Sequence, residues 1–152
     1  MDEKLAKLAA MTRHIRRCFQ EMSAVVDQLH SDLGVTASMR AVLEHLVEMG
    51  EQTVPQIASS KNVSRQHIQQ NANALEEKEL ITFRDNPAHK RSQLLQMTDK
   101  GKQTFATIRS REMTHFGAIA EAFSVDELDM ASAVLESFRS RLAEEGETRW
   151  GS

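Results

Sequence analysis

The stretch that decides the fold is Val54 to Met97, VPQIASSKNVSRQHIQQNANALEEKELITFRDNPAHKRSQLLQM. It begins with a pattern typical of two short helices joined by a tight turn. Thr53 can cap the first helix, with Pro55 in its first turn, and Asn62 tolerates the left-handed conformation that such a turn requires. Ser64 can then cap the second helix. The pattern predicts a helix-turn-helix.

The second helix of this stretch has one apolar face and one amide-rich face. Its apolar residues recur at i, i+4 and i+7, which is the spacing of a buried helical stripe. They are Ile68, Ala72 and Leu75. The opposite face carries Gln66, Gln70 and Asn73, flanked by His67 and Gln69. This face therefore offers hydrogen-bond donors and acceptors with little charge.

A hairpin follows the second helix. After Leu80 the apolar period changes to two, with Ile81 and Phe83 on one face, and a second extended run covers residues 93–97. The connecting loop, residues 86–91, is basic and contains a proline. Two helices followed by a basic hairpin predict a winged helix-turn-helix, in a chain that is mainly α with a small β-hairpin wing.

This combination of amides and basic residues suits DNA. Gln and Asn amides can pair bidentately with adenine in the major groove, while Lys and Arg neutralise phosphates or enter the minor groove. No Asp or Glu occurs from Gln52 to Leu75, although the chain has 22 of them. The alternative is an ordinary solvated, amide-rich surface. The candidate DNA-contacting residues are Ser64, Arg65, Gln66, His67, Gln69, Gln70, Asn73, Lys90 and Arg91.

From about Val35 to Phe105 the sequence resembles the multiple antibiotic resistance regulator (MarR) family of bacterial transcription factors. Three segments carry the resemblance: residues 74–81 (ALEEKELI), the wing at 86–91 (NPAHKR) and residues 95–101 (LQMTDKG). The sequence departs from the family pattern twice. Glu79 stands where the family usually has glycine after the recognition helix, and the Asp-Arg pair that braces the family's wing is His89-Lys90 here, followed by Arg91.

The resemblance implies a homodimer held together by helices outside the reading domain. We expect a winged helix-turn-helix domain over 36–104, N- and C-terminal dimerisation helices over 1–35 and 105–146, and a tail over 147–152. The first helix, expected from Asp2 to Asp32, has an apolar seam that needs helical partners. The seam consists of Ile15, Phe19, Met22, Val26, Leu29 and Leu33.

Other caps and stripes mark the remaining helices. Gly34 ends the first helix, and Thr36 caps a helix that Gly50 closes. Its expected core stripe is Met39, Val42, Leu43, Leu46 and Val47. Thr98 caps a helix expected to run from Asp99 to about Phe123. Residues 124–127 (SVDE) form a capping box for a last helix, whose stripe is Leu128, Ala131, Leu135, Phe138 and Leu142.

Composition limits the compartment and the class of protein. The formal charge is −3, but the charge is segregated: residues 112–147 contain nine acids and two arginines, away from the expected DNA face. A single cysteine excludes an internal disulfide and fits a reducing cytoplasm. A leader sequence and a long apolar run are both missing, which argues against secretion and membrane spanning. We expect a cytoplasmic protein.

An effector pocket is implied by the family resemblance, for a small aromatic or anionic molecule near the dimer cleft. Its candidate residues are His14, Cys18, Met39, Arg40 and His115. Each also has a simpler interpretation, because free cysteine and methionine usually serve as packing residues and scattered histidines are usually solvated. Another alternative is a redox sensor of the same fold that uses Cys18. The histidine spacing gives no metal site, and no cofactor is expected.

Enzyme motifs are missing: the sequence has no phosphate-binding glycine loop, no nucleophile elbow and no zinc-hydrolase helix. Together with the resemblance to the MarR family, this indicates a homodimeric, DNA-binding transcriptional regulator, and the resemblance implies a repressor released by a small molecule from a pseudo-palindromic operator. The alternative from another class is a winged-helix module that binds protein. That module would expose a hydrophobic recognition face, whereas this one is rich in amides.

Overall fold

The computed structural model describes residues 2–150, and the side chains as far as Gly146, in two compact units that divide between Glu112 and Met113. The first unit combines the predicted reading domain with the N-terminal helix and the start of the helix that follows the wing. The last helix continues to Trp150, so residues 147–150, expected to be part of a tail, are helical. Residues 151–152 of that tail lie outside the described residues.

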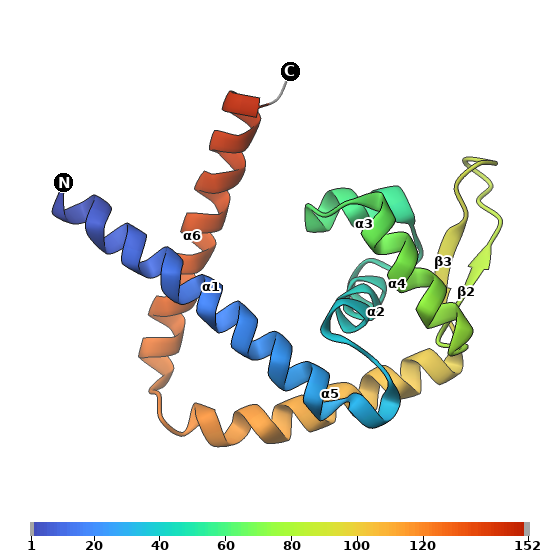
Figure 1. Ribbon diagram of the computed structural model, residues 1–152, viewed down its shortest axis with the longest axis horizontal. Helices are drawn as coiled ribbons and strands as arrows, with labels where there is room; N and C mark the ends of the chain where they lie inside the picture. Colours follow the sequence, from blue (N-terminus) through green and yellow to red (C-terminus); the bar gives the residue numbers. More distant parts are fainter. Residues whose placement is uncertain (1, 151–152) are drawn as a thin grey trace. The chain divides into compact units, whose positions relative to one another are not determined.

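The first unit is mainly helical with one small sheet, as the sequence predicts (Figure 1). In chain order its elements are α1 (Glu3–Leu29), a short 3-10 turn η1 (Ser31–Leu33), α2 (Ala37–Met49), β1 (Gln52–Thr53), α3 (Val54–Lys61), α4 (Arg65–Glu77), β2 (Ile81–Arg84), β3 (Leu94–Met97) and the first part of α5 (Asp99–Ala120). Helices α3 and α4 form the predicted helix-turn-helix, and β2 and β3 form the wing.

The predicted N-caps are confirmed, but the predicted end of the first helix is wrong. Helix α1 ends at Leu29 and not at Asp32, and Gly34 ends the 3-10 turn η1 that follows it. The hydroxyl of Thr36 accepts a hydrogen bond from the Met39 amide, which starts α2. Thr53 starts α3 in a capping box with Gln56, because each side chain bonds the other residue's amide. Asn62 ends α3 in the left-handed conformation, with φ of 53°. These local signals determine where the helices of the helix-turn-helix begin and end.

The sheet has three antiparallel strands in the order β1-β3-β2, one more than the predicted hairpin. In the wing, Ile81 pairs with Met97 and Phe83 pairs with Leu95. Strand β1 adds two residues on the other side of β3, where Gln52 pairs with Leu95. A strand of two residues is too short to show an apolar period, so the sequence could not predict it.

A single hydrophobic core joins α2, α3, α4, the sheet and α5. Its fully buried members include Leu43, Ile57, Leu75, Leu95 and Ile108. The predicted stripe on α2 is confirmed at four of its five positions and wrong at Val47, which is 49% exposed. Val47 follows Leu46 by one residue, and a step of about 100° turns its side chain off the buried face.

The junction between α4 and β2 is a tight left-handed turn. The Leu80 amide donates to the Leu75 carbonyl at 2.9 Å and the Glu79 amide donates to the Glu76 carbonyl at 2.7 Å, which is the Schellman pattern. Glu79 takes the left-handed position with φ of 61° although it is not glycine. Gly101, near the start of α5, lies so close to the Leu80 carbonyl that a Cβ atom would overlap its oxygen.

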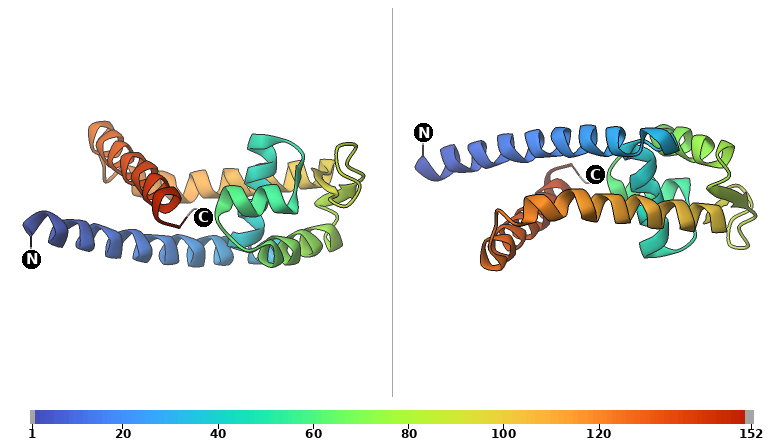
Figure 2. Two further views of the ribbon diagram at one scale, coloured as in Figure 1. Left: turned by 90° about the horizontal axis from the view of Figure 1, so that it is seen from above. Right: turned by 90° about the horizontal axis from the view of Figure 1, so that it is seen from below.

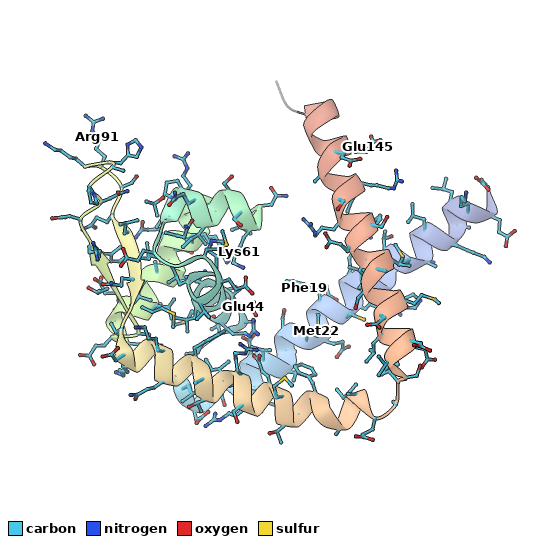
Figure 3. All side chains as sticks on the ribbon, turned by 180° about the vertical axis from the view of Figure 1, so that it is seen from behind. Phe19, Met22, Glu44, Lys61, Arg91 and Glu145 are labelled. Carbon is cyan, nitrogen blue, oxygen red and sulfur yellow. The ribbon has the colours of Figure 1, made fainter. Side chains whose placement is uncertain are left out.

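Helix α1 is one continuous helix (Figure 2), and two of the six residues of the predicted seam are exposed in the single chain. Phe19 is 67% exposed and Met22 is 49% exposed, whereas Val26, nearer the core, is buried. Both Phe19 and Met22 are labelled on this helix in Figure 3. A long apolar face left open on one chain is a candidate surface for another helix.

The second unit contains the end of α5 and α6 (Val125–Trp150). Helix α5 ends at Ala120, three residues before the predicted end. The predicted capping box of α6 is confirmed, since Ser124 Oγ accepts from the Glu127 amide and the Glu127 carboxylate accepts from the Ser124 amide at 2.8 Å. Large apolar side chains are exposed along α6, among them Leu128, Val134, Leu135 and Leu142.

Candidate nucleic-acid interface

An open groove of about 610 Å³ lies between α4 and the wing. Helix α4 supplies most of one wall, and strand β2 and the end of the wing loop supply the other. The lining residues are Val54, Pro55, Arg65, Gln66, Gln69, Asn73, Glu76, Phe83, Arg91, Ser92 and Gln93. Five of them are among the residues that the sequence singles out for DNA contact. The groove combines amides with two guanidinium groups.

The period of α4 explains why these side chains share one side of the helix. Ile68, Ala72 and Leu75 are buried in the core. At 100° per residue, Gln69, Asn73 and Glu76 form a row on the flank nearer the wing, and Gln66 lies beside that row. Gln70 projects about 60° beyond Asn73, so it is exposed on the outer face of α4 and does not line the groove. Helix α4 thus presents two adjoining polar faces.

Hydrogen bonds within α4 hold some of its amides in place. Gln69 Nε2 donates to Asn73 Oδ1 at 2.8 Å, which leaves the Gln69 oxygen and the Asn73 amino group available to a ligand. Asn71 Nδ2 donates to the His67 carbonyl at 2.8 Å. Ser64 Oγ accepts from the His67 amide as the cap of α4. The Gln69 and Asn73 pair is therefore preorganised on the groove side.

Basic side chains stand at both walls of the groove. Arg65, in the first turn of α4, and Arg91 both line it. Figure 3 shows Arg91 at the tip of the wing. Lys90 is exposed on the same tip. The tip is folded by local bonds, including the Ala88 amide to Asn86 Oδ1 at 3.0 Å and the Ser92 amide to the His89 carbonyl at 3.3 Å. Two cations that line one groove suit a phosphate backbone.

Several groove residues were not anticipated from the sequence. Glu76 continues the row of Gln69 and Asn73 by one helical turn, so the helical period could have revealed it. Phe83, Ser92 and Gln93 come from the wing, whose position against α4 depends on packing between distant segments. No local sequence pattern encodes that position.

The candidate effector residues are divided between the two units. His14 and Cys18 are exposed on α1, and Met39 is buried in the core of α2. Arg40 follows Met39 and is bound to acidic side chains. His115 belongs to the second unit, where its ring meets that of Phe116 edge-on at 5.4 Å.

A polar cluster at the corner between α1 and α2 surrounds Arg40. Its guanidinium donates to both oxygens of Glu112 on α5 and to Glu44 Oε2 at 2.8 Å. His30, completely buried, lies 3.3 Å from Glu112 through its Nε2 atom. Burial raises the pKa of the Glu112 carboxyl, but the hydrogen bonds from Arg40 and His30 outweigh burial and hold this pKa below its usual range. Glu112 is therefore a buried carboxylate.

Arg111, the neighbour of Glu112, holds the other side of the same corner. It donates to both carboxylate oxygens of Asp32, at 2.7 and 2.9 Å, and to the Leu29 carbonyl at 3.2 Å. The hydrogen bond from Arg111 lowers the pKa of the exposed Asp32 carboxyl. Two consecutive residues of α5 thus fasten the corner between α1 and α2 through opposite charges.

Other classes of site find no support in the part of the chain that the structure describes. Among the described side chains, no group of three His, Cys, Asp or Glu residues is placed to hold a metal ion. None of the described helices has the length and apolar character needed to cross a membrane.

Comparison with known proteins identifies the class. A family model described as MarR family matches residues 33–92. The crystal structure of a MarR family transcription regulator is 30% identical to this chain, covers 93% of this chain and 96% of its own, and has a TM-score of 0.80. The chain therefore belongs to the MarR family, as its sequence predicts.

Two further likenesses cover different shares of the chain. The structure of reduced AbfR bound to DNA has the same fold, with a TM-score of 0.69 at 21% identity over 94% of this chain and 99% of that one. Uncharacterized proteins of Mycobacterium tuberculosis and Mycobacterium bovis are 37% identical over 70 residues, or 46% of this chain. The chain spans about half the length of these relatives, 49%.

Proposed function

We propose that this protein is a homodimeric, DNA-binding transcriptional regulator, a repressor that a small molecule releases from a pseudo-palindromic operator. The observation that carries the proposal is the groove between α4 and the wing, with amides on one wall and Arg65 and Arg91 at its two sides. Amides match base edges in the major groove, and the two arginines match the phosphates of the strand beside it. The structure of AbfR with DNA supports this use of the fold.

The dimer is inferred from the apolar side chains left exposed on the single chain. Phe19 and Met22 on α1, and Leu128, Leu135 and Leu142 on α6, are all more than one-third exposed. Apolar surface on this scale marks an interaction site in a protein without membrane-spanning helices among its described residues. A two-fold dimer would present two copies of α4 to DNA, which suits half-sites about one helical turn apart.

The effector is proposed as a small aromatic or anionic molecule that binds at Arg40, with His14, Cys18 and Met39 of the same unit as further candidates. The guanidinium of Arg40 is already neutralised by Glu112 and Glu44. An anionic effector at this guanidinium would therefore have to displace a carboxylate. Displacement of Glu112 would break the ion pair between α5 and α2, which gives a direct physical route from the effector to the DNA-binding domain.

The test of DNA binding is a measurement of log affinity against log salt concentration, with a duplex that the protein selects from a random-sequence pool. Replacing Lys90 and Arg91 by alanine should lower the salt slope by up to about 0.9 for each phosphate that the variant no longer neutralises. The matched control is Arg139→Ala with Arg141→Ala, which removes two cations from α6 and should leave the slope unchanged. Failure of the wild-type protein to bind any duplex in a salt-dependent way contradicts the proposal.

A further inference from the structure

We propose that Glu51 is a positioning residue for DNA binding: it fixes the wing at its base through Arg84 and Gln96. This inference rests on the proposed function and deepens it. Glu51 lies between Gly50, which ends α2, and β1. Its Oε1 atom accepts a hydrogen bond from Gln96 Nε2 at 2.6 Å and another from Arg84 Nη1 at 3.2 Å.

The register of the sheet explains why these three residues meet. Gln52 pairs with Leu95, so the preceding residue, Glu51, faces Gln96 across the β1 and β3 pair. Gln96 in turn faces Thr82 on β2, and Arg84 lies on the same face two residues further along β2. One carboxylate oxygen therefore connects the end of α2 to both strands of the wing.

The strands of the wing also pack on the core through the buried Ile81 and Leu95, and Glu51 adds polar contacts on the solvent side of the sheet. Strands β2 and β3 have four residues each, and β1 contributes only two residues of pairing. The hydrogen bonds given above for the tip, residues 86–92, stay within the loop and do not orient it against α4. Lys90 and Arg91 lie in the loop at the far end of the wing from Glu51. A small change in the direction of the strands at Glu51 would therefore move these two side chains by a larger distance. Glu51 is thus placed to decide where the basic tip meets DNA.

The sign of the effect separates positioning from simple electrostatics. Glu51 is an acid near a surface proposed to bind phosphates, so its charge alone opposes DNA binding. On charge alone, removing it should strengthen binding. If Glu51 instead holds the wing in position, removing its carboxylate should weaken DNA binding. This weakening should appear only in a protein whose wing still carries Lys90 and Arg91. A role in stability alone would alter the unfolding temperature without this dependence on the wing.

The experiment combines Glu51→Ala with the wing variant Lys90→Ala/Arg91→Ala. The probe is the duplex that the wild-type protein selects from a random pool, and affinity is measured over a range of salt concentrations. Glu51→Ala should weaken binding roughly tenfold in the wild-type background, within the range of coupled neighbouring residues, and should lower the salt slope. In the wing variant it should have no further effect. Glu48→Ala, which removes an exposed carboxylate three residues earlier on α2, is the matched control and should leave binding unweakened.

A second pair of variants tests the contact itself. Glu51→Arg combined with Arg84→Glu reverses the ion pair, and the Gln96 amide can turn to offer its oxygen, so wing-dependent binding should recover relative to Glu51→Arg alone. Glu51→Gln keeps a hydrogen-bond acceptor of the same shape, so it should lose less DNA affinity than Glu51→Ala. This variant replaces Glu51→Ala in the experiment if the alanine variant unfolds. The inference is overturned if Glu51→Ala weakens binding equally in the wild-type and wing-variant backgrounds, or if it strengthens binding. It is also overturned if the reversed ion pair does not restore binding. Wild-type protein that binds no duplex would instead remove the proposed function on which it rests.

Discussion

The guanidinium of Arg40 holds the carboxylate of Glu112 in a two-pronged contact: Nε donates to Oε1 at 2.7 Å and Nη2 donates to Oε2 at 2.9 Å. This contact joins α2 to α5 across 72 residues of sequence. It also places a charged group inside the protein, since Glu112 is only 7% exposed. A buried carboxylate is tolerated because its partners satisfy both oxygens.

Glu112→Gln should destabilise the protein by about 3 kcal/mol, because it leaves the Arg40 charge without its buried partner. Urea unfolding at neutral pH measures the loss. The pKa of Glu112 is lowered in the folded state, so the contribution of the pair is present above the ordinary value of 4.5 and is lost as the pH falls through the folded pKa. The variant should therefore lose less stability than wild type on acidification. A larger acid loss in the variant would contradict this account.

Glu79→Gly should be more stable than Glu79→Ala by about 1 kcal/mol, because glycine adopts the left-handed turn after α4 without steric cost. Both substitutions remove the exposed pair with Lys100, so the difference between them isolates the backbone conformation. Thermal unfolding of the two variants provides the measurement. Equal stability would mean that the turn relaxes when the side chain is removed.

Gly101→Ala should cost about 3 kcal/mol or more, because the new methyl group would overlap the Leu80 carbonyl and force α5 away from the start of β2. Gly117→Ala is the control on the same helix, since a Cβ atom there meets open space. That substitution should be neutral or stabilising by up to about 1 kcal/mol. Calorimetry on both variants decides the matter, and similar effects at the two positions would refute the close approach.

Phe19→Asp should convert the proposed dimer into monomer. Phe19 is exposed in the single chain, so the substitution spares the core, but in a dimer it would bury an unpaired carboxylate at a cost of several kcal/mol. Gln20→Asp adds the same charge about 100° around α1 from Phe19, outside the predicted seam, and should leave the dimer intact. Light scattering gives the mass of each. A wild-type particle of 17.1 kDa, the mass of one chain, would exclude the dimer.

Gln70→Ala should relax base preference at one or two positions of each half-site, at a cost of about 1 to 3 kcal/mol in discrimination, because a glutamine amide matches adenine. Binding to non-specific DNA at low salt should persist, since the amide releases no counterions. Arg65→Ala should instead weaken binding to all sequences alike. Selection from randomised sites with each variant tests this, and an unchanged sequence logo for Gln70→Ala would show that α4 does not read the operator there.

The helices and the wing could be predicted because their signals are local. Thr36, Thr53, Ser64 and Ser124 are caps that act within four residues, and the periods of α4 and the hairpin are visible in any short window. Strand β1 could not be predicted, since its two residues are defined only by their pairing with β3. The groove and the burial of Glu112 could not be predicted for the same reason. From the sequence alone, an acidic residue such as Glu112 would be expected on a solvated surface. Their surroundings come from segments far apart in the chain.

The consecutive contacts of Arg111 and Glu112 limit how α5 can move. Successive residues project about 100° apart around a helix, so these two side chains grip the corner between α1 and α2 from two directions. Rotation of α5 about its own axis would break at least one of the grips. The remaining low-energy motions are bending and joint displacement with the corner. An insertion or deletion of one residue between Gly101 and Arg111 would turn both side chains away together, so the length of this segment is as constrained as its composition.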